Sequence, residues 1–541
     1  MDYQINLRTH QRAKAFKDNR HVCLLFLFVL NLVAFSTRGN TTVHQREQSA
    51  APGSVSASSL KVVGPTTIEE LRFRIQEVLR SAQLEPAQLA IKVASLDTGR
   101  TLYEENVRKL MNPASNLKLF TIAAALDRLT PDYRFSTSAY ARGRPDASGT
   151  ITGDLIIYGR GDPSFSASFK DGDYQKALDE LAVLIRTAGV RRVQGDLIGD
   201  ESYFTGERLV PGWAWDDLQW YYGMEVSALS VNDNSVDILL KPGRRVGDAC
   251  VLTTGPANLP SVEVLNHATT AQRGKKRTLH FYRRIGENHI EISGSLPADD
   301  QGYTDNLSVA HPALIFVSML RAALERQGIV IEGITRTRDA QTRSQETVPP
   351  PALVEIAARQ SPPLRIIAAR TLKPSQNLYA ELILRALGKA DSAASTQSSS
   401  QAGIAAVQAF ARKAGVDTGK LNLLDGSGLS RGNMVTVEAT LQLLSYMSQH
   451  RDGSVFREAL PIAGVDGTLR GRMKGTAAAN NLRAKTGAIG SAVALSGYVT
   501  SGGGERLVFS MIVNNAPTDV DPRADFTDRI AVLLAAFSGH S

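Results

Sequence analysis

Apolar residues near the start of the predicted fold recur at helical spacing and then change to strand spacing. From Ile68 to Leu79 they fall every three or four positions, and Thr66-Thr67 just before them is typical of a helix cap. The run Leu89–Leu96 is followed by the turn residues Asp97-Thr98-Gly99-Arg100 and by a shorter run, Thr101-Leu102-Tyr103. The pattern therefore predicts a helix followed by a β-hairpin.

The same helical and strand patterns of apolar residues recur toward the C-terminal end of the chain. A strongly apolar stretch predicts a helix over 112–129, and helical spacing recurs over 378–387, 403–414 and 436–449. Residues 491–514 hold two apolar runs around a glycine turn, which predicts a second hairpin. Helices and hairpins at both ends suggest one domain built from two separate segments.

The middle of the chain has a different pattern of apolar residues. Short apolar runs punctuated by Gly and Asp predict many strands, and helical spacing interrupts them at 174–187 and 311–327. We therefore expect an α/β (α+β) protein in which a discontinuous domain, 66–134 and 364–541, carries a β-rich insertion, 135–363, of two nested domains.

The N-terminal segment 1–36 is patterned for export. Several basic residues precede the apolar run 22–35, which is shorter than the roughly 20 residues of a membrane-spanning helix and suits a signal peptide. An uncleaved anchor is the alternative. Residues 37–65, rich in Ser, Ala, Thr and Gly, predict a disordered linker. The expected location is the periplasm or another extracytoplasmic part of the envelope, and peripheral membrane association is compatible with it.

Composition narrows the function classes. Apolar residues make up 43% of the chain and charged residues 21%, which is typical of a folded protein, and a net charge of +8 over 541 residues gives no nucleic-acid footprint. Of the two cysteines, Cys23 lies in the apolar run, so Cys250 alone would remain after cleavage. The histidines show no metal-ligand spacing, and we expect neither a metal nor another cofactor.

One Ser-x-x-Lys tetrad stands at a predicted helix start. Ser115 follows Pro113 and precedes an apolar helix, so its N–H points along the positive end of the helix dipole, and Lys118 lies one turn further on the same face. Alone, this pattern is more typical of a helix cap. A second copy, Ser58 to Lys61, falls in the linker.

Two further motifs follow in order. Ser375-Gln376-Asn377 stands before a predicted helix, and Lys485-Thr486-Gly487 opens a predicted strand. A second Ser-x-Asn, Ser230-Val231-Asn232, shows that the short pattern also arises elsewhere. The ordered triple is nonetheless typical of serine acyl-enzymes that act on β-lactams and D-alanyl peptides.

With these motifs in place, the chain resembles the D-alanyl-D-alanine carboxypeptidase/endopeptidase family, the class C low-molecular-mass penicillin-binding proteins. Similar segments are Gly195–Phe204, Trp220–Gly223, Asp425–Arg431 and Gly467–Leu469. The long stretch between the first two motifs also fits, because this family carries inserted domains there. The resemblance implies a penicillin-binding transpeptidase-like domain, with an antiparallel sheet flanked by helices and an α-helical subdomain.

The resemblance also implies roles for the motif residues. Lys118 would take the proton of Ser115, which would attack the carbonyl between two D-alanines. Ser375 would relay a proton to the leaving amine, and Asn377 would orient the substrate amide. Lys485 would hold the terminal carboxylate and help lower the pKa of Lys118. Peptidoglycan peptides would be substrates and β-lactams inhibitors.

Substrate contacts are implied at Thr486, Gly487 and Ala488. Thr486 would bind the carboxylate, and the N–H groups of Ser115 and Ala488 would hold the oxyanion. The family commonly has a hydroxyl residue where this chain has Ala488, so we expect one carboxylate contact of the family to be lost here.

The aromatic segment 213–224 would either lean over the site or pack in the insertion's core. Rival interpretations are a β-lactamase-like or esterase hydrolase, and a non-catalytic envelope scaffold.

Overall fold

The computed structural model describes residues 64–256, 259, 261–345, 352–391 and 397–541. The predicted export segment 1–36 and nearly all of the predicted linker 37–65 lie outside these residues. Within the described ranges, no helix has both the length and the apolar character that crossing a bilayer requires.

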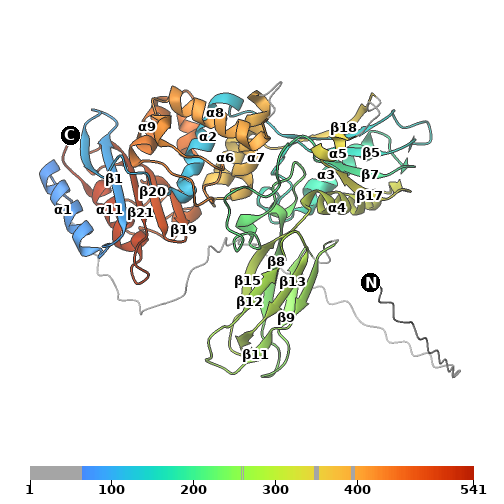
Figure 1. Cartoon of the computed structure of the whole chain (residues 1–541), viewed down its shortest axis with the longest axis horizontal. Helices are drawn as coiled ribbons and strands as arrows, with labels where there is room; N and C mark the ends of the chain where they lie inside the picture. The colour runs from blue at the N-terminus through green and yellow to red at the C-terminus, as the bar shows by residue number, and fades with distance from the viewer. Residues whose placement is uncertain (1–63, 257–258, 260, 346–351, 392–396) are drawn as a thin grey trace, which may run out of the picture. The chain divides into compact units, whose positions relative to one another are not determined.

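A five-stranded antiparallel sheet is built from both ends of the chain (Figure 1). Its order is β19-β20-β21-β1-β2, so the two predicted hairpins are joined by pairing between β21 and β1. The strands are β1 (Gln88–Ser95), β2 (Thr101–Glu105), β19 (Arg483–Ile489), β20 (Ala492–Thr500) and β21 (Arg506–Asn514). The expected antiparallel sheet is present, and β19 forms one of its edges.

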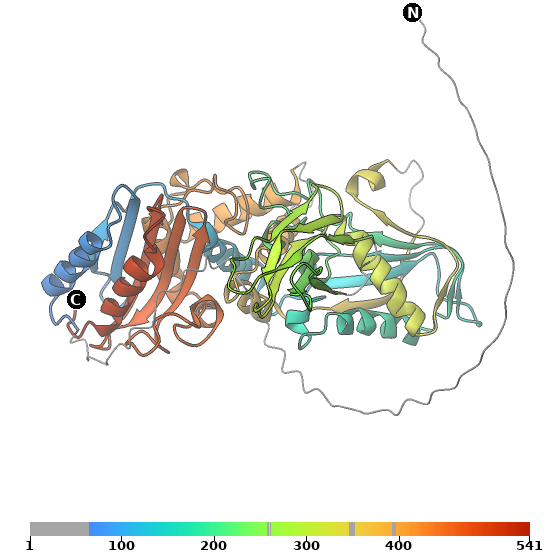
Figure 2. The same cartoon turned by 90° about the horizontal axis from the view of Figure 1, so that it is seen from below.

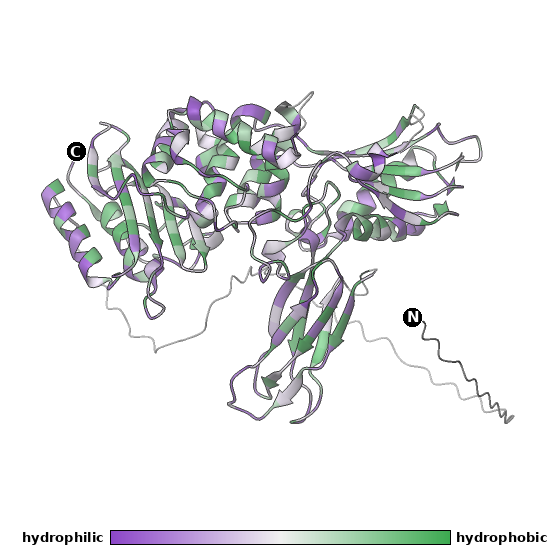
Figure 3. Cartoon of the chain, viewed as in Figure 1, coloured by the Kyte–Doolittle hydropathy of each residue, from purple (hydrophilic) through white to green (hydrophobic). Residues whose placement is uncertain are grey.

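Alternation along the strands directs apolar side chains to both faces of this sheet. Phe509 packs in a core with α1 (Ile68–Ser81) and α11 (Arg529–Ala536), whereas Val508 packs in the core on the opposite face. The helix α1 begins after the predicted cap Thr67, whose hydroxyl accepts the N–H of the third residue on. Figure 2 shows the helices layered on the sheet, and Figure 3 shows hydrophobic colour gathered in its strands.

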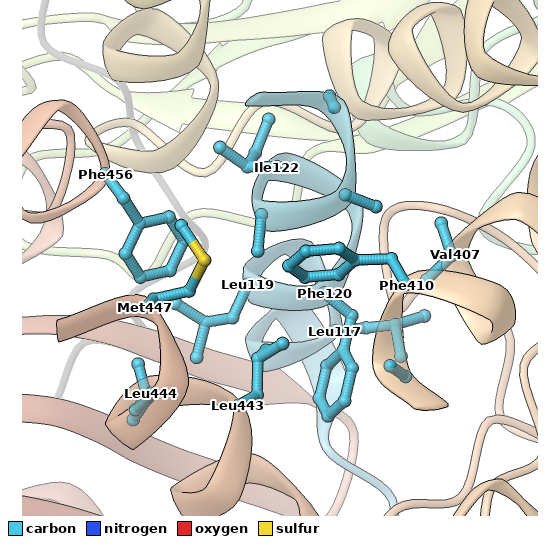
Figure 4. Close-up of a cluster of buried hydrophobic side chains, with 14 of the residues drawn as sticks. Leu117, Leu119, Phe120, Ile122, Val407, Phe410, Leu443, Leu444, Met447 and Phe456 are labelled. Atoms are coloured by element: carbon cyan, nitrogen blue, oxygen red, sulfur yellow. The ribbon is translucent and has the colours of Figure 1, made fainter. Parts of the chain in front are cut away.

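A group of helices covers the second face. The helix α2 (Lys118–Leu129) is buried at nearly every position and lies at the centre of an apolar cluster with α8, α9 and α10 (Figure 4). The surrounding helices are α6 (Leu364–Leu372), α7 (Asn377–Asp391), α8 (Ser399–Lys413), α9 (Val437–Gln449) and α10 (Gly453–Glu458). Dense packing on all sides makes α2 a rigid platform for the residues at its start.

The start of α2 differs from the prediction. The helix expected over 112–129 ends as predicted, but residues 112 and 113 lie outside it and a short 3₁₀ helix, η1 (Ala114–Leu117), precedes Lys118. The Asn112 side chain accepts the Ala114 N–H at 2.8 Å, and Ala114 has φ +45°. This local turn competes with helical geometry and delays the helix.

The region 135–363 contains more than β-structure. A five-stranded sheet, β17-β7-β5-β3-β18, includes parallel pairs, and two long helices belong to its core. Its elements are β3 (Ser136–Ala141), β5 (Leu155–Tyr158), β7 (Leu197–Asp200), β17 (Thr335–Arg338), β18 (Val354–Gln360), α3 (Gln175–Thr187) and α4 (Pro312–Arg326). A small parallel sheet and a short helix accompany them: β4 (Thr150–Ile151), β6 (Arg192–Val193), β16 (Val330–Ile331) and α5 (Ala340–Ser344).

Between β7 and α4 the chain forms three small sheets. Their strands are β8 (Ser235–Lys241), β9 (Val251–Gly255), β10 (Glu263–Asn266), β11 (Thr269–Ala271), β12 (His280–Arg283), β13 (His289–Ser293), β14 (Ser295–Pro297) and β15 (Tyr303–Ser308). In the described part of the chain, 135–363 contributes no strand to the first sheet. The boundaries 66–134, 135–363 and 364–541 stay a prediction, which this segregation supports.

Candidate active site

Ser115 lies in η1, which fits tightly between the edge strand β19 and the loop 425–431. A Cβ on Gly487 would lie 2.6 Å from the Pro113 carbonyl oxygen, and a Cβ on Gly428 would lie 1.9 Å from the Ala114 carbonyl oxygen. Both positions therefore have to be glycine for the two segments to approach η1 so closely. Ser115 itself is only half-buried.

Lys118, at the first turn of α2, is completely buried. Its Nζ lies 3.0 Å from Ser115 Oγ. It also donates to Asn377 Oδ1 and to the Ser427 carbonyl, both at 2.6 Å. Burial lowers the pKa of Lys118 from 10.5 to about 7, although the nearby carboxylates Asp425 and Glu381 favour its charged form. A neutral amine within reach of a hydroxyl is equipped to remove its proton.

The helix α7 contributes Asn377 at its first residue. While Oδ1 accepts from Lys118, Nδ2 donates to the Tyr222 carbonyl at 2.8 Å. The amide thus links the lysine to the insertion and is held in one orientation. By contrast, the second Ser-x-Asn copy is structural: Ser230 and Asn232 donate to carbonyls of their own loop.

Lys485 and Ser375 form a second contact beside the first. Lys485 Nζ donates to Ser375 Oγ at 2.9 Å and to the Thr486 carbonyl at 2.8 Å. Ser375 has φ +66°, a conformation that non-glycine residues seldom adopt and that is frequent at functional sites. Burial, reinforced by the positive charge of Lys118, lowers the pKa of Lys485 well below 10.5. For Lys118 itself, burial is the principal cause of the lowered pKa.

The remaining residues of the third motif differ in exposure. The Thr486 side chain is buried, and its hydroxyl shares a 2.7 Å hydrogen bond with the Thr468 hydroxyl. Ala488 is exposed on β19. Because β19 is an edge strand, its side away from β20 can pair with an extended peptide beyond Ala484, whose N–H already donates to the Pro461 carbonyl at 3.0 Å.

The loop 425–431 supplies contacts that the motifs did not predict. Asp425 accepts hydrogen bonds from Gly428 N, Ser430 N, Asn433 Nδ2 and Trp213 Nε1 at 2.7–2.9 Å. This network fixes the loop whose Ser427 carbonyl contacts Lys118. The sequence indicated this segment only through the family resemblance. Its contact with Lys118 is made by a backbone carbonyl, which any residue type could supply, so no motif predicts it.

The aromatic segment 213–224 is largely core. Trp213 and Met224 are buried in a cluster with Tyr379 and Leu382 of α7. Trp215 and Asp216 are exposed, Trp215 with 71% of its surface. Of the two interpretations left open by the sequence, packing in a core therefore describes Trp213 and Met224.

The chain is similar to known proteins over most of its length. The sequence profile of the D-Ala-D-Ala carboxypeptidase 3 (S13) family matches residues 71–537. A D-alanyl-D-alanine carboxypeptidase of Actinomadura sp. (strain R39) is 35% identical over 502 residues, 91% of this chain and 88% of that protein.

Two crystal structures show the same fold. Penicillin binding protein 4 from Haemophilus influenzae superimposes with a TM-score of 0.72 at 23% identity, covering 85% of this chain and 97% of that chain. The same protein complexed with a novel beta-lactam gives a TM-score of 0.67 at 22% identity, covering 86% and 97%.

Proposed function

Because the chain belongs to the D-Ala-D-Ala carboxypeptidase 3 (S13) family, a family of serine peptidases, we propose that it releases terminal D-alanine from peptidoglycan stem peptides through an acyl-enzyme on Ser115. The chain is a penicillin-binding carboxypeptidase of this family. The observation that supports the assignment of the nucleophile is the 3.0 Å contact between Ser115 Oγ and the buried amine of Lys118.

In the proposed reaction Lys118 is the general base. Its neutral amine takes the Ser115 proton, and Oγ attacks the carbonyl carbon between the two D-alanines. The oxyanion is stabilised by the N–H groups of Ser115 and Ala488. Ser375 passes a proton to the leaving amine, and its 2.9 Å contact with Lys485 supports this role. A water molecule then hydrolyses the acyl-enzyme.

Substrate binding is proposed at the edge of β19. The stem peptide adds alongside this strand, and its terminal carboxylate meets Lys485 and Thr486. Asn377, held by Lys118 and by the Tyr222 carbonyl, orients the peptide amide. Gly487 keeps β19 close enough to η1 for both segments to reach one carbonyl.

We also propose that the chain works in the extracytoplasmic cell envelope, where peptidoglycan lies, and that β-lactams inhibit it. They mimic the D-alanyl-D-alanine unit, acylate Ser115 and hydrolyse slowly.

The test is incubation of the purified protein with uncross-linked and cross-linked muropeptides, followed by analysis of the products. Released D-alanine that disappears in Ser115→Ala supports the proposal. Release of cross-linked partners would add endopeptidase activity. Rapid β-lactam turnover without D-alanine release would favour the β-lactamase-like alternative, and no penicillin adduct would favour a scaffold.

A further inference from the structure

A buried carboxylate next to the site has no part in the reaction described above. Glu381 lies on α7, one turn after Asn377, and its surface is 0% exposed. Its Oε1 accepts two backbone hydrogen bonds, from the N–H groups of Gly426 and Ser427, both at 2.9 Å. A carboxylate in this position fixes the turn between Asp425 and Gly428 from the side of α7.

The turn that Glu381 holds is itself in contact with the proposed base. The Ser427 carbonyl accepts a hydrogen bond from Lys118 Nζ at 2.6 Å. On the opposite side, the Thr121 hydroxyl of α2 donates to the Gly426 carbonyl at 2.7 Å. Two helices therefore anchor one peptide segment, and that segment presents an acceptor to the amine.

The second carboxylate oxygen makes this placement costly. In the described part of the chain, Glu381 Oε2 is buried and has no hydrogen-bond partner. Burial, together with the negative charge of Asp425, raises the pKa of Glu381 to about 7. Burying a carboxylate is costly, and two backbone hydrogen bonds from the turn stabilise it here.

We propose that Glu381 is a positioning residue for Lys118, acting through the Gly426–Ser427 turn to hold the amine against Ser115. The proposal rests on the proposed function, in which Lys118 is the base. Glu381 does not touch the reacting atoms in this scheme.

Several charged groups face Glu381 and Lys118. Arg385 faces it from the next turn of α7, Asp425 from the loop and Lys118 from α2, while Lys485 of β19 faces Lys118. The negative charge of Glu381 raises the pKa of Lys118. Because the pKa of Glu381 is itself raised to about 7, this charge is largely absent below pH 7, so the test depends on the position of the turn.

Three variants test the proposal: Glu381→Ala, Glu381→Gln and, as a matched control, Asp162→Asn. Asp162 is equally buried and pairs with Arg359 in the insertion, away from the motifs. The measurement is the rate at which fluorescent penicillin acylates each folded protein, as a function of pH. Circular dichroism checks the folding of each variant.

Glu381→Ala loses both hydrogen bonds from the turn to Glu381, and acylation should slow about 100-fold, the scale expected for a misplaced catalytic group. Glu381→Gln keeps an acceptor for the two N–H groups and loses the charge. Its rate should stay near the wild-type rate, and so should the rate of Asp162→Asn.

The proposal is overturned if folded Glu381→Ala acylates at the wild-type rate, or if Glu381→Gln, which keeps the acceptor, is as slow as Glu381→Ala. If Glu381→Ala does not fold, Glu381→Asp, whose carboxylate is one methylene shorter, replaces it and should slow acylation; an unchanged rate would overturn the proposal. Failure of the proposed function looks different, because then the wild-type protein itself would not be acylated on Ser115.

Discussion

Acylation of Ser115 should depend on pH through the charge of Lys118. A protonated amine cannot accept the Ser115 proton, so the reaction slows below the pKa of the lysine. Since burial lowers that pKa to about 7, acylation by penicillin should rise about tenfold per pH unit up to about pH 7 and then level off.

The size of the effect follows from the same burial. An exposed lysine with a pKa of 10.5 would be neutral in only about 0.03% of molecules at pH 7, whereas a pKa of about 7 makes about half of them neutral. The desolvated position of Lys118 therefore increases the reactive form about 1,600-fold at neutral pH, equivalent to about 4 kcal/mol.

The assay is stopped-flow or quenched labelling with fluorescent penicillin between about pH 5 and pH 9, with circular dichroism to check the fold at each pH. Lys118→Arg is the control, because a guanidinium stays protonated throughout this range and should leave acylation slow at every pH. A rate that keeps rising tenfold per unit through pH 9 would show an ordinary lysine. A rate that is flat from pH 5 to pH 7 would remove Lys118 from the role of base.

Further predictions concern single side chains. Ala488→Thr restores a hydroxyl beside the proposed carboxylate site and should lower KM for D-alanyl-D-alanine peptides about tenfold; an unchanged KM would contradict this. Gly428→Ala should nearly abolish penicillin labelling, because its Cβ would lie 1.9 Å from a backbone oxygen, whereas Gly504→Ala has a similar φ and open space and should label normally. Trp213→Phe loses a buried indole hydrogen bond to a carboxylate and should lower the free energy of unfolding by about 1.5–3 kcal/mol in denaturant titrations. Trp215→Phe changes a largely exposed side chain and should alter that free energy little. Equal effects of the two glycine variants, or of the two tryptophan variants, would refute the reasoning.

Local patterning predicted much of the fold because the relevant signals are short-range. The strand predicted over Leu89–Leu96 is β1, Gln88–Ser95, and the helix predicted over 436–449 is α9, Val437–Gln449. Pairing of β21 with β1 joins segments more than 400 positions apart; the similar patterns at the two ends indicated one domain but did not give this pairing. Parallel strands in 135–363 were missed, because short apolar runs do not reveal the direction of their partners.

The site could be predicted only as far as its side chains carry motifs. Lys118 and Asn377 were found from the ordered triple, and they lie in contact. Glu381 and the Ser427 carbonyl were missed. In the sequence, Glu381 is one more polar residue of a helix and a backbone carbonyl has no signature. Their roles follow only from the turn at Gly426 and Ser427, which the tertiary structure places beside Lys118. The contact between Thr486 and Thr468 likewise depends on tertiary structure.

Mass spectrometry after brief exposure to penicillin tests the central claim most directly. The wild-type protein should gain one covalent adduct that maps to the peptide containing Ser115, and Ser115→Ala should gain none and release no D-alanine from stem peptides. An adduct on another residue, or D-alanine release that survives Ser115→Ala, would contradict the assignment of the nucleophile.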